Sequence, residues 1–516
     1  MTEERPILCG SRPETHDRAT GEAGSFERTV EAIRSNPGSK PVIGLSRYSF
    51  FELPEIVRLW SELTQNSIPE GIDFELEPLN SVAKRFAELT ATLERAGIPL
   101  SAVDAELPDL LETVERAANA GTVSETTLLR LLGILCDKAF VGPHRLLFDP
   151  LYACNLDCIY CNNFSVARTN VPEELVRSHP LYRFRGRRLE PERFKELLRE
   201  AKKLRVSAIS IVGSGEPTLY PHLIEILEYA HALGFDAIDI STNGIKFPKE
   251  LAEAVIDCKL TSVTFSITGA SKESFARFHP RGAKHYETIM KNIKHLAELK
   301  KRRKSEHPGL IALSVITKDN IDEMTEFVEH AYALGCDKVW FQLIHPREFS
   351  KELELDADDI EKLRAEYARA KKRADELPIA MSWEFEYQLE RIRPGGSWTG
   401  PQLKSCPVGW WFSIITCAER VNFCCGWKQV GNIEGESFKA LWNSERYRAY
   451  RHFGKHIYRF GSVVKFENGK RLLDDFCFWC DNFNFVAEIF GLLERTGLLK
   501  FYSHDKPFDG FLESVP

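Results

Sequence analysis

The alternation of short apolar runs with amphipathic segments between residues 145 and 344 constrains the fold of this chain most strongly. Six runs rich in β-branched and aromatic residues read as strands, and the segments between them have the apolar spacing of helices. The runs lie at 145–150, 206–213, 235–242, 260–268, 310–317 and 336–344. This alternation predicts an α/β fold with a parallel sheet, curved into a partial, TIM-like (βα)6 barrel. Functional residues of such barrels lie on the loops that follow the strands.

Outside this region the composition changes several times along the chain. The first 40 residues are rich in Gly, Ser, Pro and charge without a clear period, so we expect a poorly ordered arm. Helical patterns follow up to residue 140, and no motif there indicates a role. The expected organisation is an arm at 1–40, a mostly helical region at 41–140, the barrel at 141–350, a helical linker at 351–400, a small cysteine-rich α+β domain at 401–490 and a tail at 491–516.

Composition excludes two classes of function. The chain is 43% hydrophobic and 28% charged, and it contains no apolar run long enough to span a bilayer. Its formal net charge of -7 argues against a general nucleic-acid binder, which normally carries a basic face. The first residues lack the features of a signal peptide, so we expect a cytoplasmic protein without membrane contact. In that reducing compartment, grouped cysteines favour metal or redox chemistry over disulfides.

Three cysteines follow the first predicted strand closely. Cys154, Cys158 and Cys161 have the spacing C-x3-C-x2-C. A structural zinc ion usually takes four protein ligands, and a [4Fe–4S] cluster normally takes four thiolates. A cluster held by only three thiolates leaves one iron open to a ligand that is not protein.

This loop resembles that of the radical SAM superfamily. The resemblance implies that the open iron of a [4Fe–4S] cluster binds the amino and carboxylate groups of S-adenosylmethionine (SAM). Reductive cleavage of SAM then yields a 5′-deoxyadenosyl radical. Members of the family usually carry an aromatic residue beside the adenine just before the third cysteine, and Tyr160 occupies that position.

The stretch "GSGEPTL" at 213–219 resembles the Gly-Gly-Glu-Pro motif of the same family. The match assigns Gly215, Glu216 and Pro217 to SAM binding, with Ser214 as a departure from the motif. Glycine permits close approach of the backbone. A carboxylate at 216 suits an ammonium group, since hydrogen bonds between charged partners are strong.

Later strand ends extend the resemblance. It assigns SAM contacts to Ser241 and Asn243 after the third strand, to Ser266 after the fourth, and to Arg281 before the next helix. Thr268 stands where relatives often have Asp. The sixth strand ends in "WFQLIHP", which makes Gln342 and His345 candidates to face the site.

A second group of cysteines lies between residues 406 and 480 and resembles the SPASM domain or its shorter form, twitch. The pattern includes "GNI", a helix with "LW" and a final Cys-x2-Cys. The resemblance implies one auxiliary [4Fe–4S] cluster. Its expected ligands are Cys406, Cys424, Cys477 and Cys480. Four cysteines also suit zinc, and Cys425 can replace Cys424, because neighbouring side chains on a strand face opposite ways.

The resulting hypothesis is a radical SAM enzyme that abstracts a substrate hydrogen. A closed auxiliary cluster would relay an electron, giving oxidation or bond formation on a peptide or small-metabolite substrate. The expected electron donor is a flavodoxin or ferredoxin-type protein. Two alternatives remain: a radical epimerase with Cys417 or Cys425 as hydrogen-atom donor, and a non-catalytic iron–sulfur or zinc scaffold. The residues do not determine the substrate.

Overall fold

The chain forms two compact units, Met1–Val141 with Val486–Pro516, and Gly142–Phe485. The computed structural model describes residues 7–8, 25–35, 42–45, 47, 49, 52–64, 76–96, 98, 100–102, 106–161, 173–178, 184–345, 348–392, 405–474, 477, 480 and 483–502. Within these ranges, no helix is both long enough and apolar enough to cross a membrane.

The first unit combines a small parallel sheet with helices. The sheet has the order β1 (Ile7–Leu8), β2 (Val42–Leu45), β3 (Leu100–Ala102). Its helices are α2 (Ser25–Ser35), α3 (Leu53–Thr64), α4 (Val82–Arg95), α5 (Leu107–Ala120) and α6 (Glu125–Leu135). β1 and α2 fall within the expected poorly ordered arm, most of which lies outside the described residues.

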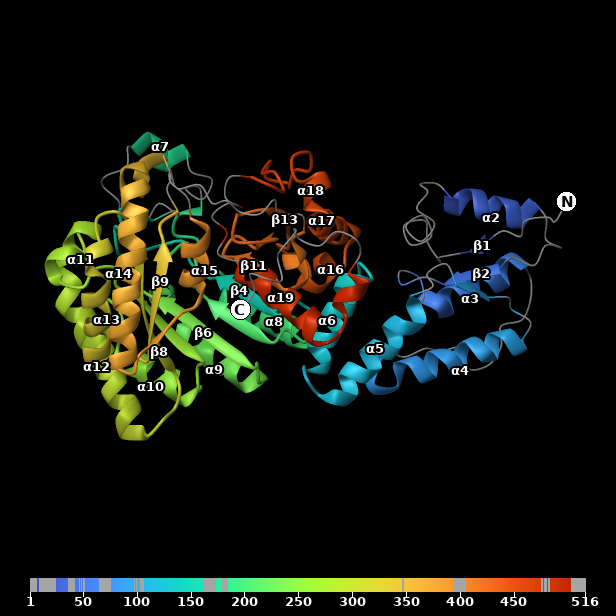
Figure 1. Cartoon of the computed structure of the whole chain (residues 1–516), viewed down its shortest axis with the longest axis horizontal. Helices are drawn as coiled ribbons and strands as arrows, with labels where there is room; N and C mark the ends of the chain where they lie inside the picture. The colour runs from blue at the N-terminus through green and yellow to red at the C-terminus, as the bar shows by residue number, and fades with distance from the viewer. Residues whose placement is uncertain are drawn as a thin grey trace. The chain divides into compact units, whose positions relative to one another are not determined.

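The second unit contains the predicted barrel (Figure 1). Six parallel strands are neighbours in sequence order: β4 (Arg145–Asp149), β5 (Ala208–Ile211), β6 (Ala237–Thr242), β7 (Ser262–Ser266), β8 (Gly309–Ile316) and β9 (Lys338–Leu343). The helices that connect or follow them include α8 (Pro191–Lys203), α9 (Leu223–Leu233), α10 (Lys249–Asp257), α11 (Lys272–Phe278), α12 (Tyr286–Arg303), α13 (Met324–Ala333) and α14 (Ala357–Glu376). The prediction of a partial barrel with crossover helices is confirmed.

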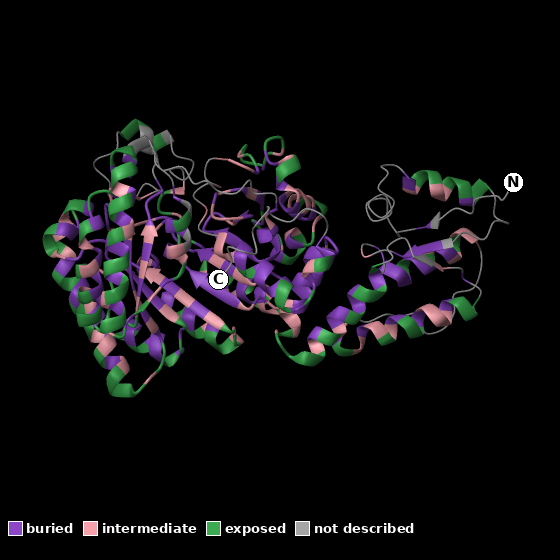
Figure 2. Cartoon of the chain, in the orientation of Figure 1, coloured by how far each residue is buried: buried purple, intermediate pink, exposed green. Residues whose placement is uncertain are grey.

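Apolar periodicity explains why these helices pack on the sheet. In α9 the buried residues are Leu223, Ile226, Leu227 and Ala230, which lie on one face of a helix. The helix ends at Gly234, whose φ of 72° lies in the left-handed region that glycine adopts easily. Figure 2 shows the same division across the barrel, with buried residues along the strands and exposed residues on the outer sides of the helices.

The sheet does not stop at the barrel. β11 (Phe412–Thr416) of the cysteine-rich region pairs in parallel with β4, from Phe412 opposite Arg145 to Thr416 opposite Asp149. β12 (Arg420–Asn422) and β13 (Gln429–Asn432) continue it as antiparallel strands, and β10 (Ala380–Met381) extends the other edge beside β9. The cysteine-rich region therefore shares one ten-stranded sheet with the barrel.

Candidate functional site

A pocket of about 350 Å³ lies at the carboxyl ends of the barrel strands. It gathers the three cysteines of the first loop and nearly every residue that the resemblance assigns to SAM. The lining includes Cys154, Cys158, Tyr160, Cys161, Gly215, Glu216, Pro217, Ser241, Asn243 and Ser266, together with Gln342 and His345. Arg281 is not part of the lining: its side chain is exposed, and its backbone amide donates to Asp157 Oδ2 at 2.9 Å. Its role in SAM binding stays a prediction.

The three cysteines of the first loop line the same pocket. Burial raises the pKa of the Cys158 thiol well above its usual range, and negative charge on Cys161 and Cys154 raises it further. In the described ranges, no three His, Cys, Asp or Glu side chains are grouped tightly enough to hold a single metal ion. A four-iron cluster holds its thiolates farther apart than a single ion does.

Backbone packing holds the "GSGEPTL" loop against the cysteine loop. A Cβ at Gly215 would collide with the backbone carbonyls of Leu151 and Ala153. The amide of Glu216 donates to the same Ala153 carbonyl at 2.8 Å. Glycine is thus required here by the protein's own backbone, which differs from the ligand contact expected from the motif.

The Glu216 carboxylate is buried and receives four hydrogen bonds. The amide and hydroxyl of Thr218 donate to Oε1 at 3.0 and 2.7 Å, and the Thr242 hydroxyl donates to the same atom at 2.7 Å. The Asn243 amide donates to Oε2 at 2.7 Å. Burial raises the pKa of Glu216, while these hydrogen bonds lower it. The loops after β5 and β6 are therefore joined through one carboxylate.

Tyr160 is fixed by two side chains from the next loops. Its hydroxyl lies 2.8 Å from Thr268 Oγ1 and 3.1 Å from His279 Nε2. Burial lowers the pKa of His279 to about 4, so its imidazole is neutral near pH 7. Since Nδ1 lies 3.0 Å from the Phe275 carbonyl, which only accepts, the ring proton is on Nδ1 and the unprotonated Nε2 faces the Tyr160 hydroxyl, which donates its own proton to Thr268. Sequence reasoning missed His279, which has no motif of its own.

A second buried carboxylate lies behind the pocket wall. Asp149, at the end of β4, accepts from the Ser214 hydroxyl at 2.6 Å, and Ser214 lines the pocket. Its other oxygen has no hydrogen-bond partner in the described part of the chain. Burial raises the pKa of Asp149 to about 7, although hydrogen bonds from Ser214 oppose this. The serine that departs from the family motif thus has a specific partner, which no sequence motif indicates.

The second cysteine group also converges. Burial raises the pKa of the Cys406 thiol well above its usual range, and charge on Cys480, Cys424 and Cys477 adds to the effect. Burial also raises the pKa of the Cys424 and Cys477 thiols, and negative charge on Cys480 adds to the effect. Cys424 thus interacts electrostatically with other members of the predicted group, and whether Cys424 or Cys425 is the ligand stays a prediction.

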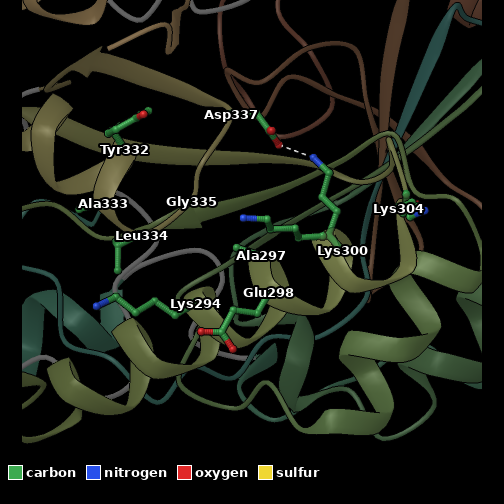
Figure 3. A pocket seen from close by; sticks show the side chains of 12 residues that line it. Lys294, Ala297, Glu298, Lys300, Lys304, Tyr332, Ala333, Leu334, Gly335 and Asp337 are labelled. Atoms are coloured by element: carbon green, nitrogen blue, oxygen red, sulfur yellow. Dashed lines mark hydrogen bonds and ion pairs between the residues drawn. The ribbon is translucent and has the colours of Figure 1, made fainter.

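A larger pocket, of about 600 Å³, lies at the opposite end of the barrel, between the carboxyl ends of α12 and α13 (Figure 3). Lysines of α12 line it, and Lys300 pairs with Asp337 at 2.7 Å just before β9 begins. It contains none of the residues that the motifs single out. The smaller rim pocket is therefore the candidate active site.

Two family models match the chain: the radical SAM superfamily over residues 149–340, and the SPASM iron–sulfur cluster-binding domain over residues 406–481. The chain therefore contains a radical SAM domain and a SPASM domain. A mycofactocin maturase, MftC, of Mycobacterium tuberculosis is 26% identical over 202 residues, which are 39% of this chain and 44% of that protein. A probable GTP 3′,8-cyclase of Saccharolobus solfataricus is 22% identical over 215 residues, which are 41% of this chain and 60% of that protein. The matches thus span about half the length of these curated relatives.

Among solved structures, SuiB of Streptococcus suis bound to S-adenosylmethionine has a similar fold. The TM-score is 0.50 at 14% identity, and the match covers 73% of this chain and 84% of SuiB. The radical SAM and SPASM domains imply SAM, a [4Fe–4S] cluster and auxiliary iron–sulfur, as predicted. The residues of the chain fit these groups, because three thiols share a pocket with the Glu216 carboxylate and four further thiols converge in the SPASM domain.

The two extra cysteines of the SPASM domain do not line the rim pocket. Cys417, directly after β11, is buried against Tyr152, with Phe184 and Trp427 packed beside it. Burial raises the pKa of its thiol to about 12. A hydrogen-atom donor must reach the substrate radical, and the role of Cys417 or Cys425 as such a donor stays a prediction.

Replacing Glu216 with Gln tests the carboxylate that joins two rim loops. Four donors converge on both carboxylate oxygens, so the NH2 group of the substituted side chain must point at one or more donors. This loss of hydrogen bonding lowers the free energy of unfolding by about 1–3 kcal/mol. We expect a lower thermal midpoint and loss of SAM binding, measured by calorimetry and by equilibrium dialysis with labelled SAM. Glu225→Gln, on α9 and half exposed, is the control and retains both. Unchanged SAM affinity in E216Q would contradict the assignment.

The raised pKa of Asp149 predicts a pH-dependent stability. With a folded pKa of about 7 against an ordinary 3.8, the folded state keeps a proton that the unfolded state releases. This contribution is present below about pH 4 and is lost as the pH rises through about 7. Asp149→Asn has no titrating proton at this position. The difference in thermal midpoint, variant minus wild type, should therefore increase from about pH 5 to about pH 8. An equal difference at both pH values would refute the buried carboxylate's role.

The two adjacent cysteines provide a matched pair. Cys424→Ala should lose the iron of the auxiliary cluster, since Cys424 shares an electrostatic environment with Cys406, Cys477 and Cys480. Cys425→Ala should keep it. Iron and sulfide analysis of anaerobically reconstituted protein measures the difference, and the reverse result would make Cys425 the ligand.

Proposed function

We propose that this protein is a radical SAM enzyme that modifies a peptide or a small metabolite through abstraction of a hydrogen atom. Bound SAM, once reduced by the cluster on Cys154, Cys158 and Cys161, supplies the 5′-deoxyadenosyl radical for that step. The observation that carries the proposal is the rim pocket, where these three thiols and Glu216 meet.

The residues around the pocket have distinct positioning roles in this proposal. Glu216, held by four donors, offers its remaining acceptor positions to the ammonium of SAM. Tyr160, fixed through its hydroxyl, presents its ring to the adenine. Gln342 and His345, at the end of β9, line the same pocket and are available to the substrate.

Cys406, Cys424, Cys477 and Cys480 are the proposed ligands of one auxiliary [4Fe–4S] cluster. Because four thiolates close such a cluster, its function is electron transfer rather than substrate binding. Net oxidation or coupled bond formation follows if this cluster accepts the electron of the substrate radical. The names of the curated relatives, a maturase and a probable cyclase, support a biosynthetic modification. A flavodoxin or ferredoxin-type protein is the proposed electron donor.

The test compares wild type with the triple variant C154A/C158A/C161A after anaerobic reconstitution. With SAM and dithionite, wild type should release 5′-deoxyadenosine, detected by liquid chromatography. The triple variant should release none, because it lacks the open cluster, and yet keep the iron and the electron paramagnetic resonance (EPR) signal of the auxiliary cluster. Wild type with full iron content and no 5′-deoxyadenosine would favour a scaffold instead.

Substrate class and outcome require a second measurement. Peptide and small-metabolite fractions from a deuterated extract are incubated separately, and the active fraction transfers deuterium into 5′-deoxyadenosine. Loss of two hydrogens from the product indicates oxidation. A product of unchanged composition that takes up solvent deuterium at one carbon would indicate epimerisation.

A further inference from the structure

Lys428 places a cation inside the auxiliary-cluster region. It follows β12 in the turn that leads to β13, and only 2% of the residue is exposed. Its carbonyl accepts from the Phe423 amide at 2.8 Å, which fixes the backbone of this turn. The ammonium group lies 2.9 Å from Cys477 Sγ and 3.2 Å from Asp474 Oδ1. The lysine is therefore in hydrogen-bond contact with a proposed cluster ligand.

Burial of this ammonium requires compensating negative charge. An unpaired ammonium is costly inside a protein, and Asp474, itself 25% exposed, offers part of the compensation. Across the described residues between 405 and 480, the buried charged side chains are all cationic: Lys428, Arg448, Arg451 and Lys455. A cluster held by four thiolates carries net negative charge. It fits an interior with this excess of buried cations.

A hydrogen bond from a charged donor to a ligand sulfur has a defined effect on an iron–sulfur cluster. Reduction adds negative charge, part of which resides on the sulfurs. A neighbouring cation that donates to sulfur stabilises the reduced form more than the oxidised form, and so raises the reduction potential. Burial strengthens the effect, because the surrounding dielectric constant is low.

We propose that Lys428, by donating an N–H···S hydrogen bond to Cys477, raises the reduction potential of the auxiliary cluster and equips it to accept an electron from the substrate radical. The proposal rests on the ligand assignment made under the proposed function. In the step concerned, the substrate radical loses one electron to the oxidised cluster and one proton to water. The oxidised form of the flavodoxin or ferredoxin-type carrier, whose reduced form is the proposed electron donor, then removes the electron from the cluster. Lys428 is a positioning and tuning residue, since it acts through Cys477.

The test uses the full-length chain with the substitutions C154A/C158A/C161A, so that only the auxiliary cluster contributes to the EPR signal. Lys428→Met removes the charge at similar length, and Lys428→Arg retains a cation. Lys439→Met removes the same charge from an exposed position on α16 (Phe438–Trp442) of the same domain and is the control. EPR-monitored redox titration gives the midpoint potential of each variant, and iron content is measured in parallel.

A midpoint that shifts to lower potential in K428M, and little in K428R or K439M, supports the proposal. An unshifted or higher midpoint in K428M with full iron content overturns it. If K428M does not retain iron, the variant Asp474→Asn provides the test. It removes the carboxylate 3.2 Å from Lys428 and should raise the midpoint potential of the auxiliary cluster. An unshifted midpoint in D474N overturns the proposal. Absence of any cluster from the parent triple variant would refute the ligand assignment itself, separately from the tuning.

Discussion

The pairing of β4 with β11 is the constraint on which the rest of this structure depends. β4 is bonded on one side to β5 of the barrel and on the other to β11 of the SPASM domain. Because both pairings are parallel, the carboxyl ends of all three strands lie at the same rim. The loop with the first cysteines leaves β4, and Cys417 leaves β11. The two cysteine regions are thus joined by one continuous backbone ladder.

Buried charge differs in sign between the two regions. At the rim, Asp149 and Glu216 are buried carboxylates with raised pKa values, one lining the pocket and the other directly behind its wall. SAM carries a sulfonium and an ammonium group, so it brings the charge that such carboxylates attract. In the SPASM domain the buried charged side chains of the described residues are cations, which suit an anionic cluster. Each region is therefore complementary to the group that its family binds.

Local patterns in the sequence predicted the strands and helices of the barrel, but they did not predict the contacts between residues that are distant in the chain. Periodicity located all six strands, and contiguous motifs located Tyr160 and Glu216, since strand ends of a parallel sheet bring such motifs to one rim. His279 and Asp149 were missed because their importance comes from partners far away in the chain. The extension of the sheet by β11 was missed for the same reason: strand pairing between distant segments leaves no periodic signal. The SAM contact that the resemblance assigns to Arg281, whose side chain is exposed, stays a prediction.

Under the proposed ligand assignment, the opposite buried charges also give the two clusters opposite tasks. A cluster near buried carboxylates resists the addition of an electron, and its reduced form is a strong donor, as reduction of SAM requires. A cluster near buried cations gains an electron more easily, as an acceptor for a substrate radical must. The number of thiolates separates the clusters chemically, since three leave an iron open and four do not. Under the same proposal, the surrounding charge separates them energetically, with donation at one site and acceptance at the other along a single sheet.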